Sequence, residues 1–165
     1  KNCYKHRICP TDESQIKKSI FIYSDPVDAY LSLWKRDIVK CHLYNLGIEN
    51  NVVFTSSENE FIGRVDIDAL LEFGDIYRFT EMFDCWLETK VSYPILFLKY
   101  EEIWNNLEEL FEFVEIPSEN IPKFPKKKQR TSSRTELNKY QIASLKKIYE
   151  HLNEKINTMK GAEII

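Results

Sequence analysis

The chain lacks the sequence features that mark secreted or membrane-spanning proteins. Its 165 residues contain no Asn-x-Ser/Thr acceptor, no signal-peptide pattern and no apolar run near the ~20 residues that a transmembrane helix requires. Its four cysteines (Cys3, Cys9, Cys41 and Cys85) are too few to form a disulfide framework in a chain of this length. We therefore expect a cytoplasmic protein that does not contact a membrane.

Charge is low overall but unevenly distributed. The net charge of -3 argues against a surface that binds nucleic acid as a whole. Residues 123–134 nevertheless contain six positive charges and no negative charge, which leaves a net charge of -9 on the rest of the chain. An anionic partner such as a phosphate would therefore meet one local basic patch. Its residues are Lys123, Lys126, Lys127, Lys128, Arg130 and Arg134.

Two continuous apolar runs predict β-strands covered on both faces, SIFIYS at 19–24 and YPILFLKY at 93–100. Asp25 is a favourable N-cap and Pro26 suits the first helical position, so a helix should start there and end near Gly47. Strands that alternate with helices predict a single α/β domain over 1–165, with a small parallel sheet flanked by helices. We also predict helices at 58–73, 76–89, 101–116 and 136–158, a short strand at 51–55, and a basic surface loop at 117–135.

The junction Tyr23-Ser24-Asp25-Pro26 is the first candidate binding site. In an open parallel sheet, ligands bind beyond the carboxyl ends of the strands, where the free N–H groups and the dipole of a helix N-terminus attract anions. Ser32, two turns along the helix, could offer its hydroxyl to the same ligand. The alternative interpretation is structural, namely a capped helix that packs on its sheet.

The spacing of SDPVDAYLS, residues 24–32, resembles the RDPxDxxxS signature of the cytosolic-type sulfotransferases. Farther along, Trp86, KYEEI at 99–103 and FVEIP at 113–117 are similar to that family's Trp-containing helix, its strand ending in Tyr-Glu-Asp-Leu and its helix closing in FLGIP. The resemblance covers residues 1 to about 158. It implies a P-loop NTPase-like sulfotransferase fold, and 3′-phosphoadenosine 5′-phosphosulfate as co-substrate without a metal.

The resemblance also implies roles for individual residues. Ser32 and the Ser24 junction would bind the nucleotide 3′-phosphate, and Arg130 or Arg134 would replace a late basic segment that reaches the same phosphate. His6 falls where the family often has a catalytic base, and Lys5 would neutralise charge on the sulfuryl group. The implied reaction is sulfuryl transfer to a hydroxyl or amine of a small-molecule or glycan acceptor.

Three departures from the family pattern leave an alternative open. Ser24 stands where the signature has Arg, and the late basic segment contains no glycine. The loop that holds the 5′-phosphosulfate, a Gly-containing Lys-Ser/Thr-Gly-Thr turn, does not occur in the 165 residues. Either the first βα unit lies upstream of Lys1, or the chain is a non-catalytic module that binds a nucleotide, a sulfated ligand or a protein.

Other motifs admit competing interpretations. Cys3, His6 and Cys9 could bind zinc if Cys41 or His42 supplied a fourth ligand, although the spacing is not a common zinc pattern. Glu101 and Glu102 could supply a carboxylate to a site at the end of the second strand, or could simply complement a helix dipole. We interpret His42 and His151 as ordinary surface or boundary residues. We expect four aromatic residues of the predicted helix at 76–89 to pack in the core, namely Tyr77, Phe79, Phe83 and Trp86.

Overall fold

The computed structural model describes residues 7–36, 42, 66–128 and 133–165. The predictions that fall elsewhere, which are the strand at 51–55, most of the helix at 58–73 and a helix end at Gly47, lie outside the described residues. The described elements are β1 (Ser19–Tyr23), α1 (Pro26–Lys35), α3 (Ile67–Leu71), α4 (Phe79–Glu88), β2 (Ile95–Lys99), the 3-10 helix η1 (Tyr100–Asn105), α5 (Leu107–Phe113), the 3-10 helices η2 (Ser118–Lys123) and η3 (Ser133–Glu136), α6 (Lys139–Ile148), α7 (Glu150–Thr158) and β3 (Ala162–Ile164).

The architecture is α/β, with a three-stranded sheet in the order β1-β2-β3. β1 pairs with β2 in parallel, with Ser19 opposite Ile95 and Tyr23 opposite Lys99. β3 pairs with β2 in antiparallel orientation, so the sheet is mixed and the prediction of a parallel sheet is wrong for this strand. β3 has only three residues, too few for an alternating pattern to mark it in the sequence.

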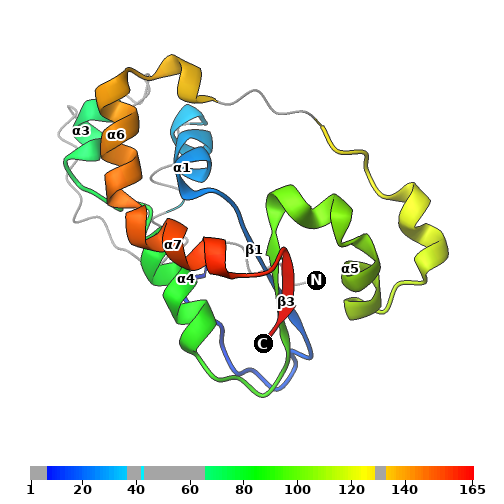
Figure 1. Ribbon diagram of the computed structural model, residues 1–165. Helices are drawn as coiled ribbons and strands as arrows, with labels where there is room; N and C mark the ends of the chain where they lie inside the picture. Colours follow the sequence, from blue (N-terminus) through cyan, green and yellow to red (C-terminus); the bar gives the residue numbers. More distant parts are fainter. Residues whose placement is uncertain (1–6, 37–41, 43–65, 129–132) are drawn as a thin grey trace, which may run out of the picture.

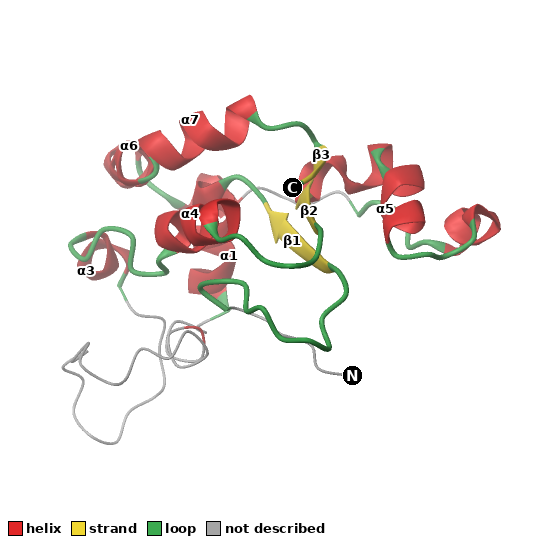
Figure 2. Cartoon of the chain, turned by 90° about the horizontal axis from the view of Figure 1, so that it is seen from below, coloured by secondary structure: helices red, strands yellow, loops and turns green. Residues whose placement is uncertain are grey.

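Helices cover the two faces of the sheet (Figures 1 and 2), and each face has its own core. Phe21 and Phe97 point to one face, where they pack against Phe83 and Trp86 of α4 and residues of α7. Leu96 and Leu98 point to the other face and pack against η1 and α5. β2 is buried on both faces as predicted, but the same prediction is wrong for β1, which leaves Ile22 55% exposed.

Two helices predicted as continuous are broken. The predicted helix at 101–116 is divided at Asn106, whose side chain donates to the backbone oxygen of Glu102 at 2.8 Å. The predicted helix at 136–158 is divided at Tyr149, a fully buried residue whose hydroxyl donates to Asp75 at 2.8 Å. The hydrogen bond at Asn106 is local, whereas the one at Tyr149 joins segments that are far apart along the chain. The predicted loop at 117–135 also contains η2 and η3.

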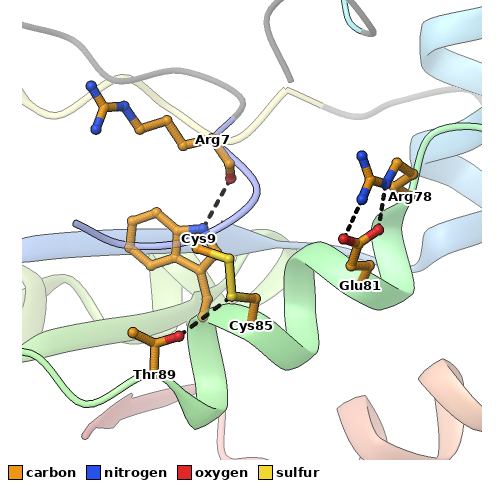
Figure 3. Close-up of a disulfide and its surroundings, with 7 residues drawn as sticks. Arg7, Cys9, Arg78, Glu81, Cys85 and Thr89 are labelled. Carbon is orange, nitrogen blue, oxygen red and sulfur yellow. Dashed lines mark hydrogen bonds and ion pairs between the residues drawn. A yellow bond between two sulfur atoms is a disulfide. The ribbon is translucent and has the colours of Figure 1, made fainter. Parts of the chain in front are cut away.

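A disulfide between Cys9 and Cys85 joins the first described segment to α4, with the two Cα atoms 5.2 Å apart (Figure 3). The indole N–H of Trp86 donates to the backbone oxygen of Arg7 at 3.0 Å, and the hydroxyl of Tyr93 donates to the backbone oxygen of Thr11 at 2.8 Å. Because Cys9 is in a disulfide, it is not available as a zinc ligand, which removes the proposed Cys3-His6-Cys9 set.

We expect the double variant Cys9→Ser/Cys85→Ser to lose about 2–4 kcal/mol of unfolding free energy, because the bond closes a long loop in the unfolded chain. Urea denaturation followed by circular dichroism measures this loss. Reductant should lower the stability of the wild-type protein to that of the double variant and leave the variant unchanged. Equal stability of the oxidised and reduced wild-type protein would contradict the prediction.

Candidate functional site

A cavity of about 1160 Å³ opens at the carboxyl ends of β1 and β2. Figure 1 shows the chain leaving η2 and passing back toward this edge of the sheet. Residues 124–128 of this passage, which we call the strap, are fastened to η1 by two hydrogen bonds. The indole N–H of Trp104 donates to the backbone oxygen of Pro125, and Lys127 Nζ donates to that of Glu101, each at 2.8 Å. The strap therefore forms one wall of the cavity, and β1, α1 and η1 form others.

The cavity brings together residues of two separate features of the sequence, the signature-like segment and the basic patch. Ser24 and Ser32 both line it, as do Lys127 and Lys128 of the strap. Lys35 and Arg36, from the end of α1, add two more cations to the lining. The sequence marked the lysines only as part of a basic patch. Because they are far from Ser24 along the chain, the sequence did not predict that they line the same cavity as Ser24.

The N-terminus of α1 is occupied by its own cap. The Asp25 carboxylate accepts hydrogen bonds from the backbone N–H groups of Val27 at 2.9 Å and Asp28 at 3.1 Å. The sequence correctly predicted this cap and the helix start at Pro26. The expectation that free N–H groups would receive an anion is wrong for these two groups, since the carboxylate already uses them.

Arg134 lies at the same helix end, where its guanidinium forms ion pairs with Asp25 at 2.7 Å and with Asp28 at 2.8 Å. Burial lowers the pKa of Arg134, but hydrogen bonds to the two carboxylates outweigh it and raise the pKa above its ordinary value. A third ion pair, between Lys35 and Glu136, also joins η3 to α1. A phosphate that used Arg134 would have to compete with both aspartates.

Apolar side chains also line the cavity. Phe79, Phe83, Leu152 and Ile156 line it from α4 and α7. The prediction that Tyr77, Phe79, Phe83 and Trp86 pack in the core is confirmed, and Phe79 and Phe83 also line the cavity.

The predictions for the three histidines compare differently with the structure. His42 lines the cavity, is only 2% exposed and bonds through Nε2 to the backbone oxygen of Tyr77 at 2.9 Å. Its interpretation as a surface or boundary residue is therefore wrong. His151 is exposed, as expected. His6 lies outside the described residues, as do Lys5 and Arg130.

Among the described residues, no group of three or more His, Cys, Asp or Glu side chains could hold a metal ion. The same part of the chain contains no helix with the length and apolar character needed to cross a membrane. No protein-family model matches the chain, and no curated protein or solved structure matches it. The resemblance to sulfotransferases therefore stays a prediction.

Replacing Asp25 separates its capping role from its charge. We expect Asp25→Ala to cost about 1–2 kcal/mol of unfolding free energy, because two backbone N–H groups lose their acceptor. Asp25→Asn should recover most of that loss, since asparagine is also a good N-cap. Chemical denaturation of the three proteins provides the comparison. If the asparagine variant were as unstable as the alanine variant, the ion pair with Arg134 would be the larger effect.

Tyr23, at the end of β1, should make stability depend on alkaline pH. Burial, followed by the carboxylates of Glu163 and Glu101, raises its pKa from 10.0 to about 12. Because the folded pKa lies above the unfolded value, the contribution of Tyr23 is complete below about pH 10 and is lost as the pH rises toward 12. Urea denaturation across this range should show a shallower decline for Tyr23→Phe than for the wild-type protein. Tyr140→Phe is the control, because Tyr140 is 74% exposed, and it should leave the decline unchanged.

Proposed function

We propose that the cavity binds 3′-phosphoadenosine 5′-phosphosulfate and that the protein transfers its sulfuryl group to a hydroxyl or amine acceptor. The observation that carries this proposal is the gathering of Ser24, Ser32, Lys127 and Lys128 in one cavity at the carboxyl end of a parallel strand pair. Two of these residues come from the signature-like segment, and the other two supply positive charge where the signature arginine is replaced by Ser24.

The residues around the cavity suit an anionic nucleotide. The ammonium groups of Lys127 and Lys128 would offset phosphate charge, and the serine hydroxyls would donate hydrogen bonds to phosphate oxygens. Tyr100 and Trp104 also line the cavity and offer aromatic surface to a base. The volume of about 1160 Å³ leaves room for an acceptor beside the nucleotide. We include a P-loop NTPase-like sulfotransferase fold in this proposal. The described residues themselves form only a small mixed sheet.

A non-catalytic binding module is the second candidate. Two N–H groups of α1 and the guanidinium of Arg134 already bind Asp25 and Asp28, so fewer groups are available to hold a phosphate strongly. In that case the cavity would bind a nucleotide or a sulfated ligand without transfer.

We also propose that the protein works in an oxidising compartment instead of the cytoplasm predicted from the sequence. The Cys9–Cys85 disulfide supports this location, because disulfides persist in such compartments and are rare in the cytosol.

Calorimetric titration with adenosine 3′,5′-bisphosphate at low salt tests the nucleotide site. We expect the wild-type protein to bind this ligand more tightly than adenosine 5′-monophosphate, because the second phosphate meets additional donors. Ser32→Ala should weaken binding by about tenfold or more, the cost of one hydrogen bond to a charged group. Lys128→Ala should weaken it by a smaller factor that disappears at high salt.

Lys146→Ala is the matched control, since Lys146 is an exposed lysine on α6 and is not part of the cavity lining. It should leave the affinity unchanged. Equal affinity for the two nucleotides, or equal losses in the Lys128 and Lys146 variants, would contradict a bisphosphate site in this cavity.

A further inference from the structure

Glu101 lies at the edge of the sheet where the candidate site is built. The parallel register places Tyr23 opposite Lys99, so Ser24 and Glu101 follow the ends of two adjacent strands. Both residues line the cavity. The sequence alone does not say whether Glu101 or Glu102 serves such a site, and the structure distinguishes the two residues.

Glu102 has a structural role, whereas Glu101 retains an unused acceptor. The side chain of Asn105 donates to Glu102 Oε2 at 2.7 Å within η1. Glu101 Oε2 is buried and has no hydrogen-bond partner among the described residues. A buried carboxylate oxygen without a donor is unfavourable, and a donor from a ligand would relieve this cost.

Two hydrogen-bond donors near Glu101 donate to backbone oxygens and not to its carboxylate. The Tyr23 hydroxyl, close enough for the Glu101 charge to raise its pKa, donates its proton to the backbone oxygen of Lys160 at 3.1 Å. Lys127 Nζ donates to the backbone oxygen of Glu101 and lies 5.6 Å from the centre of the Trp104 ring. These contacts fix the surroundings of Glu101 and leave Oε2 as an acceptor.

We propose that the Glu101 carboxylate is the proton acceptor for the acceptor hydroxyl in sulfuryl transfer, an inference that rests on the proposed function. The acceptor O–H bond breaks as its proton moves to the carboxylate, and the oxygen forms a bond to sulfur. The bond between sulfur and the 5′-phosphate oxygen breaks, and adenosine 3′,5′-bisphosphate leaves with the electron pair. The products are a sulfate ester, the bisphosphate and a protonated Glu101, which then releases its proton to solvent.

The test compares Glu101→Gln with Glu102→Gln, using phenol and 4-nitrophenol as acceptors. At about pH 8, phenol keeps its proton and needs a base, whereas the more acidic 4-nitrophenol is largely ionised. We expect Glu101→Gln to slow transfer to phenol by about 100-fold or more and to have much less effect with 4-nitrophenol. Glu102→Gln should leave both rates near those of the wild-type protein.

Nucleotide affinity provides a readout that is independent of transfer. Removing one negative charge beside the cavity should leave the affinity of Glu101→Gln for adenosine 3′,5′-bisphosphate unchanged or tighter, because repulsion from the phosphates decreases. A large loss of affinity would assign Glu101 to nucleotide binding or folding and overturn its role as a base.

The two proposals fail in different ways. If the wild-type protein does not bind the bisphosphate, the proposed function and the role of Glu101 fall together. If it binds the bisphosphate but Glu101→Gln transfers to phenol at the wild-type rate, only the role of Glu101 is overturned. An equal slowing with both phenols, or no transfer by the wild-type protein to either, also overturns that role.

Discussion

The parallel pairing of β1 with β2 is the contact on which the candidate site depends. It joins Ser19–Tyr23 to Ile95–Lys99, two segments that are far apart along the chain. Parallel strands direct their carboxyl ends to one edge of a sheet, so the residues that follow them converge. Ser24 and α1 leave this edge from one strand, and Glu101 and η1 leave it from the other. Without this register, the signature-like segment and the acidic pair would have no common cavity.

The α1 N-terminus illustrates a conflict between stability and anion binding. A helix start needs acceptors for its first N–H groups, and Asp25 supplies one internally while Arg134 balances its charge. The arrangement stabilises the junction, but it places a carboxylate where a phosphate would otherwise lie. Any anion affinity must then come from groups outside the helix end, which makes Ser32 and the strap lysines more important than the helix dipole.

The sequence predicted the features that local chemistry determines. The strand at 19–23, the cap at Asp25 and the start at Pro26 depend on neighbouring residues, and the structure has all three. The break at Tyr149 depends on a hydrogen bond to the distant Asp75, and the Cys9–Cys85 pairing depends on how the first segment packs on α4. Such features require the three-dimensional arrangement. The same distinction applies to the candidate site. The spacing of the signature-like segment selected Ser24 and Ser32, whereas only the fold brings Lys127 and Lys128 to the same cavity.

The strap places positive charge beside the cavity of an acidic protein. The chain outside residues 123–134 carries a net charge of -9, which would repel a bisphosphate if its field acted at full strength. Salt screens exposed charges beyond about 8–10 Å, so the charges that line the cavity dominate at short range. Hydrogen bonds from Trp104 and Lys127 hold the strap against η1 and place its lysines at the cavity. The position of the cationic strap, and not the net charge of the chain, would therefore decide the affinity of the cavity for an anion.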